Sequence, residues 1–531
     1  MKAFTAATAA VACAACFTTP AHADKPKAVH GMACVDLVTL NLPDARIDSA
    51  TVVSAGPLSA ISGSTAVAPT CSSDNAAPQL PALCRVQGTI GPGQIKFEVW
   101  LPLEGWNGKY QGLGNHGFAG NIEYTDMAPE LLKGYAVSGT DTGHQGSATA
   151  WMQNHQAIVD YGSRGIHEVA VKSKAIVEAF YAKAPKFSYF NGCSTGGKEG
   201  LMAAQRYPGD FDGINIGGSA NFDQIGNRTQ YVWNGVVTFG HTPPLPLAGS
   251  TLTLINQAVV AACDAQDGVV DGVIDNPLAC DWQPSSLLCQ AGQTTNCLTQ
   301  AQVTALELVY QGPRNSRGVE LYPGMPRGSE LGWNGHTTGP NIFSTADQFF
   351  KFMVFNDPNW NFRTFDFDSG FDFAKANYSA LIDAVDPDLS AFRKSGGKLL
   401  YTHAWSATVH TGTRSIEYYE QVARQIRGGD HDHDRVHFGK TREFFRLFMA
   451  PSAAGSKGPS TLDSMPALER WVEQGIAPRS LIAVHKTAGV VDRSRPLCPY
   501  PEHAVYLGSG SIDDAANFVC RRERKDHKDR D

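Results

Sequence analysis

Apolar and polar positions follow one another in patterns that predict strands and helices in turn along the N-terminal part of the chain. Residues 47–67, rich in small and β-branched side chains, predict a leading antiparallel sheet, and from 95 to 101 every second residue is apolar, as in a half-buried strand. The stretches 108–120 and 134–144 each predict a strand that runs into a glycine-rich loop, and 167–183 carries apolar side chains at helical spacing. This alternation favours a doubly wound parallel sheet.

The regular pattern stops after Ala220. Residues 221–386 contain four cysteines, an Asp/Gly-rich loop and many aromatic side chains. We therefore predict an α/β core in two parts, 24–220 and 387–520, interrupted by a lid domain at 221–386. The second part of the core contains a strand at 397–401, a helix at 415–427, a strand at 444–449 and a helix at 465–474. The final residues, 521–531, mix both charges without apolar side chains and are expected to be disordered.

The strongest chemical signal lies where a short strand, 187–190, meets a helix that begins near Lys198. Between them stands Gly192-Cys193-Ser194-Thr195-Gly196, a G-x-S-x-G pentapeptide in the strand–turn–helix context of a nucleophile elbow. Such a turn exposes the serine hydroxyl at the carboxyl edge of the sheet, beside a helix N-terminus that favours developing negative charge. We predict that Ser194 is a nucleophile; the alternative is an ordinary glycine-rich turn.

The charge of the chain indicates which partners it can bind, and its N-terminal residues indicate where it is located. The 531 residues include 44 Lys and Arg against 51 Asp and Glu, and no basic patch precedes the C-terminus, which argues against nucleic acid. Residues 1–23 have the form of a signal peptide, with Lys2, an apolar stretch and the cleavage motif Ala21-His22-Ala23. No later run approaches the roughly 20 apolar residues of a membrane span. We therefore predict a secreted or periplasmic protein that begins at Asp24.

Ten cysteines remain once the predicted signal peptide is removed. An even set of this size in an exported chain is typical of a disulfide framework. Three pairs are plausible from their closeness in sequence: Cys263–Cys280, Cys289–Cys297 and Cys498–Cys520.

An acidic loop at 263–275 is the second chemical signal. Aspartates recur every three or four residues between glycines, and oxygen ligands in a flexible loop suit Ca²⁺. The spacing is not that of an EF-hand, so we expect a structural ion; the alternative is a solvated acidic turn. A further cluster, Asp430-His431-Asp432-His433-Asp434 with His437 nearby, could bind a transition metal, but we interpret it as an exposed polar loop.

Together these motifs resemble those of the tannase and feruloyl esterase family, which also includes the hydrolase of mono(2-hydroxyethyl) terephthalate. The resemblance covers essentially the whole mature chain and rests on Gly114–Gly120, Asp141–His144, Gly192–Gly197, Ala204–Pro208, Asp264–Asp275 and Arg495–Tyr500. It implies an α/β-hydrolase fold with a large inserted lid, a structural calcium ion, and serine-dependent cleavage of small esters of aromatic acids.

The resemblance also implies roles for particular residues. The oxyanion donors would be the backbone N–H groups of Thr195 and Gly117. The calcium ligands would be the side chains of Asp264, Asp267 and Asp271 and the carbonyls of Val269 and Val273. The implied disulfides are Cys34–Cys84, Cys263–Cys280, Cys289–Cys297 and Cys498–Cys520. Cys71 and Cys193 are left over, and we expect both to be reduced; the alternative is a bond between them.

The chain departs from the family pattern at the other two members of the catalytic triad. The slot of the triad Asp holds Ala407, and the slot of the triad His holds Gly455. Ser456 stands where the family has the cysteine that bonds the residue before the nucleophile. A serine without a base is a poor nucleophile at neutral pH, so a substitute base is needed. His410 is our first choice and His144 the second.

Two functions from different classes follow. The first is an exported serine esterase that cleaves esters of aromatic acids through an acyl-enzyme on Ser194. The alternative is a catalytically impaired relative that binds aromatic ligands under its lid. The vacant triad slots favour the second function, and the intact elbow favours the first.

Overall fold

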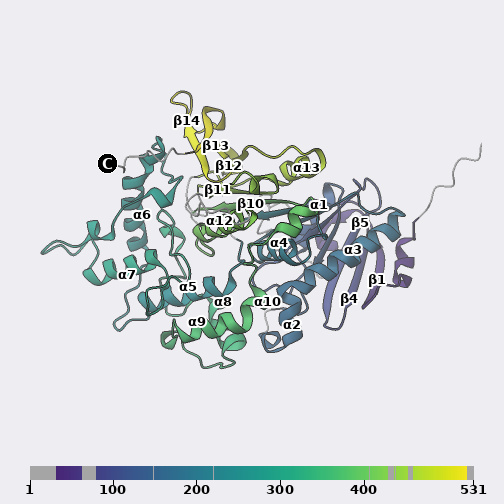
Figure 1. The fold of residues 1–531 in the computed structure, drawn as a ribbon, viewed down its shortest axis with the longest axis horizontal. Helices are drawn as coiled ribbons and strands as arrows, with labels where there is room; N and C mark the ends of the chain where they lie inside the picture. Colours follow the sequence, from purple (N-terminus) through teal and green to yellow (C-terminus); the bar gives the residue numbers. More distant parts are fainter. Residues whose placement is uncertain are drawn as a thin grey trace, which may run out of the picture.

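A nine-stranded mixed sheet forms the centre of the computed structural model (Figure 1). The structure describes residues 31–61, 79–146, 149–218, 220–405, 407–427, 436, 438–451 and 458–522. The strands lie in the order β1, β4, β5, β7, β6, β8, β9, β10, β11. Their bounds are β1 Ala45–Val53, β4 Leu83–Ile90, β5 Ile95–Pro102, β6 Lys109–Leu113, β7 Ala136–Thr140, β8 Phe187–Cys193, β9 Gly213–Gly217, β10 Lys398–Ala404 and β11 Phe445–Ala450.

The sheet is antiparallel on one side and parallel on the other. Strands β1, β4, β5 and β7 pair antiparallel, whereas β7, β6, β8, β9, β10 and β11 pair parallel. Parallel neighbours end at the same edge, so the loops after β6, β8, β9, β10 and β11 meet at one side of the molecule. Ser194 directly follows β8, which lies in the middle of this parallel group.

Strand β5 differs from its prediction, because it is buried on both faces rather than half-buried. The polar position that suggested exposure is Glu98, which is 1% exposed. Its carboxylate receives two hydrogen bonds from Arg85, at 2.6 and 2.8 Å, and a third from the Trp100 indole at 2.8 Å. A paired charge of this kind can be buried, so alternation of residue type did not indicate exposure.

Helices cover both faces of the sheet. Successive residues of a strand point to opposite faces, and accordingly Phe190 belongs to one apolar cluster and Tyr189 to another. The first cluster includes side chains of α3 (Gly165–Tyr181), α4 (Thr195–Arg206) and α12 (Gly412–Arg427), and the second includes side chains of α1 (Tyr124–Leu132) and α13 (Met465–Gln474). The sheet therefore has a separate core on each side.

Between β9 and β10 the chain builds a helical region with two apolar clusters of its own. It includes α5 (Gln224–Val237), α6 (Ser250–Cys263), α7 (Gln300–Gln311), α8 (Ser344–Gln348), α9 (Ser369–Ala374) and α10 (Ala380–Ile382), before α11 (Ser390–Lys394) leads back to β10. Since β9 and β10 are neighbours in the sheet, this region is an insertion between adjacent strands. In Figure 1 it forms the teal and green part beside the sheet. The boundaries 221–386 stay a prediction.

Two small antiparallel sheets follow α13. Strand β12 (Leu481–Thr487) pairs with β13 (Val490–Leu497), and β14 (Glu502–Tyr506) pairs with β15 (Phe518–Arg522). Because Arg521 and Arg522 belong to β15, the predicted disordered tail does not begin at 521; residues 523–531 lie outside the described ones. The predicted signal peptide and the cluster 430–434 with His437 also lie outside them. Within the described residues no helix is long and apolar enough to cross a membrane.

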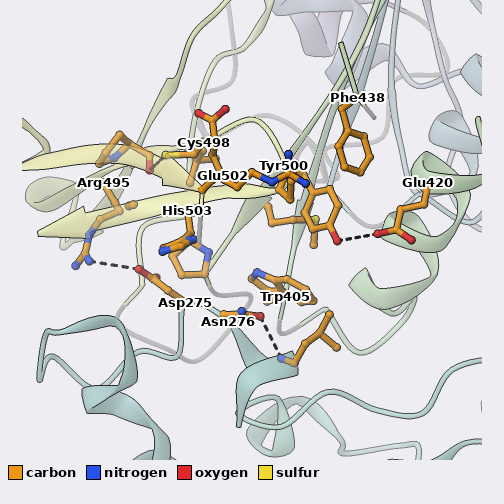
Figure 2. Close-up of a pocket in the computed structure, with 18 of the residues that line it drawn as sticks. Asp275, Asn276, Trp405, Glu420, Phe438, Arg495, Cys498, Tyr500, Glu502 and His503 are labelled. Atoms are coloured by element: carbon orange, nitrogen blue, oxygen red, sulfur yellow. Dashed lines mark hydrogen bonds and ion pairs between the residues drawn. The ribbon is translucent and has the colours of Figure 1, made fainter. Parts of the chain in front are cut away.

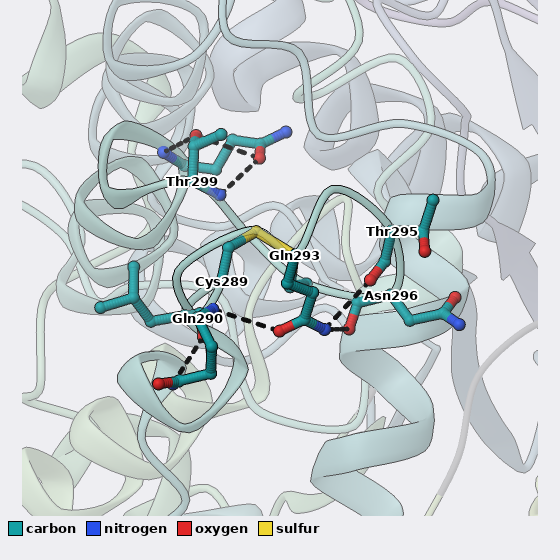
Figure 3. The surroundings of a disulfide bond; sticks show 9 residues. Cys289, Gln290, Gln293, Thr295, Asn296 and Thr299 are labelled. Carbon is teal, nitrogen blue, oxygen red and sulfur yellow. Dashed lines mark hydrogen bonds between the residues drawn. A yellow bond between two sulfur atoms is a disulfide. The ribbon is translucent and has the colours of Figure 1, made fainter.

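Four disulfide bonds join cysteines that the structure describes: Cys34–Cys84, Cys263–Cys280, Cys289–Cys297 and Cys498–Cys520. They are the four pairs that the family resemblance implies. The Cys289–Cys297 bond closes a short loop in which the Gln293 side chain accepts from the Gln290 backbone N–H at 3.1 Å (Figure 3). Cys193 is also disulfide-bonded, which corrects the expectation of a reduced thiol, while Cys71 lies outside the described residues.

Candidate active site

The backbone at Ser194 has the conformation expected of a nucleophile elbow. Ser194 has φ 53° and ψ −118°, a strained combination for a residue with a side chain, between β8 and α4. A Cβ on Gly192 would lie 2.8 Å from the Gly196 carbonyl carbon, and one on Gly114 would lie 2.5 Å from the Gly196 Cα. Three glycines are therefore required because three backbone segments cross at this point.

The loop after β6 lies against the elbow and brings the two predicted oxyanion donors together. The buried Thr195 hydroxyl donates a hydrogen bond to the Gly117 carbonyl. Gly117 has φ 58° and is exposed, and a Cβ added to it would meet no atom within 4 Å. Space for a substrate oxygen is thus open beside Gly117. The role of the two N–H groups stays a prediction.

Asn115 fixes this loop to the start of α4. Its carbonyl accepts from the Gly196 N–H at 2.7 Å, and its own N–H donates to the Glu199 carboxylate at 3.0 Å. The Asn115 side chain donates to the carbonyls of Thr140 and Asn121 at 2.7 and 2.9 Å. Glu199 is 1% exposed, and burial raises its pKa above the ordinary range. The loop is therefore held by hydrogen bonds on both sides.

A histidine in the same loop was not among the predicted site residues. The His116 Nε2 lies 2.7 Å from a carboxylate oxygen of Asp126, on α1, and the His116 Nδ1 lies 4.0 Å from the Cys193 sulfur. Burial lowers the pKa of His116, but the hydrogen bond to Asp126 and its charge outweigh burial, so the pKa is raised. Its position after a parallel strand next to β8 was a signal that the sequence offered.

The comparisons with known proteins identify the family to which this arrangement belongs. A family profile described as tannase and feruloyl esterase matches residues 84–521. The chain belongs to the tannase and feruloyl esterase family. This is a family of carboxylic ester hydrolases with an α/β-hydrolase fold, so the predicted fold is confirmed.

Relatives of this family are similar along almost the whole chain. An uncharacterized esterase of Xanthomonas campestris is 36% identical, covering 92% of this chain and 91% of the relative. Feruloyl esterase C of Talaromyces stipitatus is 32% identical, covering 85% and 88%. The crystal structure of feruloyl esterase B from Aspergillus oryzae has a TM-score of 0.80 at 29% identity, covering 91% of this chain and 98% of that one.

The predicted substitute base, His410, lies in a buried loop after β10. Its side chain is 3% exposed, and its carbonyl accepts from the His403 Nε2 at 3.0 Å. Burial lowers the pKa of His410 well below its ordinary value, and the charges of His403, Arg228 and His336 lower it further. No hydrogen bond joins His410 to Ser194 within the described residues. Its role as base stays a prediction.

The slots of the triad Asp and the triad His hold Ala407 and Gly455. Ala407 is 6% exposed, and its N–H donates to the Ala404 carbonyl at 3.1 Å. The slot of the triad Asp is thus filled by a buried methyl group. Gly455 and Ser456 lie outside the described residues.

The second choice of base, His144, packs among aromatic side chains. Its ring stacks on Trp151 at a centroid distance of 4.2 Å, and burial lowers its pKa to about 4. Phe118, from the loop beside the elbow, lies edge-on to the same Trp151 at 6.0 Å. The Arg228 guanidinium, from helix α5 of the insertion, is 5.0 Å from the Phe118 ring. The insertion therefore meets the elbow's loop through aromatic rings.

The acidic loop, residues 263–275, offers only oxygen atoms as ligands, and the negative charge of its carboxylates is only partly neutralised. The Asp264 carboxylate accepts from the N–H groups of Asp271, Gly272 and Val273. Burial and the neighbouring carboxylates raise the pKa of Asp267 and of Asp275, and neither carboxylate oxygen of Asp275 has a hydrogen-bond partner.

Arginine supplies part of the missing positive charge. Asp271 pairs with Arg495 at 2.5 Å and with Arg493 at 3.3 Å. Within the described residues no group of three or more His, Cys, Asp or Glu side chains has the arrangement of a metal site. Arg495 also pairs with Asp275, at 3.6 Å. The repulsion between carboxylates that raises the pKa values of Asp267 and Asp275 nevertheless fits a hard divalent cation in chemistry.

A cavity of about 800 Å³ opens beside the carboxyl ends of β10 and β11 (Figure 2). Trp405, Met449 and Pro451 line it, together with residues of the acidic loop, α12 and the C-terminal strands. Polar pairs cross its wall, such as the Tyr500 hydroxyl to Glu420 at 3.0 Å. Ser194, Thr195 and Gly117 do not line this cavity, so we do not assign it to the ester.

Proposed function

We propose that this protein is an exported serine esterase that cleaves esters of aromatic carboxylic acids through an acyl-enzyme on Ser194. The strained backbone at Ser194, between β8 and α4, is the observation that carries this proposal. This conformation is typical of a nucleophile elbow, and the backbone N–H groups of Thr195 and Gly117 would hold the oxyanion.

The substrate class follows from the surroundings of the elbow. Phe118, Trp151 and Tyr161 form a group of rings at centroid distances of 4.9 to 6.4 Å beside the loop that holds Gly117. Rings of this kind favour a planar aromatic acyl group. The names of several relatives, feruloyl esterases, support the same class. Export is supported by the N-terminal signal motif and by the disulfide bonds.

A structural calcium ion in the acidic loop is part of the proposal. Asp264, Asp267 and Asp271 would hold it with the carbonyls of Val269 and Val273. A divalent cation would neutralise carboxylates that otherwise repel one another, so these carboxylates would stay close together in the folded loop. The ion would act on stability and not on the ester.

The impaired-relative alternative rests on the two triad slots, which hold Ala407 and Gly455. The slot of the triad Asp is filled by a buried methyl group. If no base serves Ser194, the protein would bind aromatic ligands without turning them over.

Hydrolysis of methyl ferulate and of a gallate ester by the purified mature protein distinguishes these functions. We expect turnover that Ser194→Ala removes. Binding of ferulate without turnover by a correctly folded protein would instead establish the alternative.

A further inference from the structure

We propose that His116, oriented by Asp126, is the general base that activates Ser194, in place of the family histidine whose slot holds Gly455. The proposal deepens the proposed function and rests on it. It assigns a catalytic role to a residue of the loop after β6, a different element from the one that carries the family histidine.

Contacts on both sides of Ser194 place His116 beside it. Strands β6 and β8 are parallel neighbours, with Leu113 paired to Asn191, so their loops leave the same edge of the sheet. The His116 ring reaches Cys193, the residue before the serine, and the carbonyl of Gly117 accepts from Thr195, the residue after it. Residues 116 and 117 thus contact the residues on either side of Ser194 in the chain.

The Asp126 contact sets which ring nitrogen faces the elbow. With Nε2 donating its proton to the Asp126 carboxylate at 2.7 Å, Nδ1 is the nitrogen that lies against Cys193, the residue before Ser194. The second Asp126 oxygen is buried without a hydrogen-bond partner, so the imidazole is the group that compensates this carboxylate. A base oriented by a carboxylate is the arrangement that activates a serine in hydrolases.

The charges around His116 favour the imidazolium that forms when Nδ1 takes the serine proton. The acids that raise its pKa are Asp126 on α1, Glu123 just before α1, and Glu199 on α4. By contrast, burial lowers the pKa of His410, and His403, Arg228 and His336 each lower it further. Of the two histidines, His116 therefore has the surroundings of a base that must become positively charged.

The proton and electron pairs balance in each step. The Ser194 oxygen bonds to the ester carbonyl carbon, its proton passes to His116 Nδ1, and the carbonyl electron pair moves to the oxygen facing Thr195 and Gly117. The bond to the alkoxy group then breaks, and that group takes the proton from Nδ1. Water repeats the sequence: Nδ1 takes its proton, the hydroxide attacks the acyl carbon, and the proton returns to the Ser194 oxygen as the carboxylic acid leaves.

The test measures Ser194 reactivity independently of any ester. A fluorophosphonate probe bonds to an activated serine with loss of fluoride, and peptide mapping locates the adduct. We expect the probe to label Ser194 in the intact mature protein. In His116→Ala the labelling should be at least about a hundredfold slower, because that is the lower limit of what general base catalysis contributes. His116→Gln should be slow as well, and added imidazole should partly restore labelling of His116→Ala.

Two further variants separate a base from a structural residue. Asp126→Asn removes the charge that raises the pKa of His116. The imidazole should then stay deprotonated to lower pH, so the drop of the labelling rate on acidification should move to lower pH. The maximal labelling rate should also be lower than in the parent protein. His485→Ala is the matched control: His485 pairs with Asp492 at 2.6 Å on an outer hairpin, and its loss should change neither rate nor pH profile.

Each outcome decides the proposal. Labelling that depends on His116 in a protein that hydrolyses no aromatic ester would keep the base and reject the proposed substrate class. Unchanged labelling in His116→Ala, labelling lost only in His410→Ala, or an intact protein that the probe does not label at Ser194 would each overturn it. Melting curves that match the parent protein make any loss of labelling a loss of chemistry.

Discussion

The two halves of the catalytic edge differ in what surrounds them. On the side of β6 and β8, glycine backbones cross, the Thr195 hydroxyl reaches Gly117, and acids surround His116. On the side of β10, the corresponding loop holds Ala407 and a buried His410, whose pKa is lowered by burial and by the charges of His403, Arg228 and His336. Under the proposal above, the first side would supply both the nucleophile and its base. The loss of two triad residues on the other side would then not disable the site.

The largest expected effect comes from Ser194 itself. Ser194→Ala should lower ester hydrolysis by at least about a thousandfold, because removing a triad nucleophile leaves only binding and oxyanion stabilisation. Initial rates on methyl ferulate measure this. A variant that kept more than a tenth of the parent rate would show that the β8 side is not the catalytic half.

Calcium removal separates the stability of the insertion from the chemistry of the elbow. Chelation should lower the melting temperature, since a ligand at a hundred times its Kd stabilises by about 2.7 kcal/mol. Fluorophosphonate labelling of Ser194 below the melting transition should be unchanged, because the acidic loop contacts Arg493 and Arg495 of β13.

Asp267→Ala is the matched variant for this experiment, and it should melt at the same temperature with and without chelator. A parent protein whose melting ignores both chelator and added calcium would reject the ion.

A smaller effect, on the free energy of unfolding, is expected where the backbones of Gly114, Gly192 and Gly196 lie close together. Gly114→Ala puts a Cβ 2.5 Å from the Gly196 Cα, and overpacking of this kind costs about 1–3 kcal/mol. Gly209→Ala is the control, because a Cβ there meets no atom within 4 Å. Urea denaturation of both variants compares the two costs. Equal urea midpoints for the two variants would contradict this prediction, because they would mean that the elbow accommodates the added methyl group without cost.

The sequence predicted the regular elements more readily than the surroundings of the site. Helix α13 matches its predicted bounds, 465–474, and the elbow lies where G-x-S-x-G placed it. Both depend on local patterns, because a helical period or a motif is contained in a few neighbouring residues. The burial of Glu98 in β5 was not predictable, since it depends on Arg85 in another strand.

His116 was missed for a related reason. Its partners are Asp126, ten residues later on a helix, and Cys193, which is far away in sequence. The substitute base was sought at the carboxyl edge of the sheet, and His410 was favoured because it follows the strand 399–401 in the loop that holds the vacant acid slot. Burial and the sign of the neighbouring charges distinguish the two histidines, and both come from packing.

The most direct measurement is intact-protein mass spectrometry of the mature enzyme quenched during turnover of an aromatic ester, followed by mapping of the modified peptide. The account predicts one aromatic acyl group, on the peptide that contains Ser194, which forms in the parent protein and is absent in Ser194→Ala. Hydrolysis at the same rate in Ser194→Ala, or an acyl group on a different residue, would contradict it.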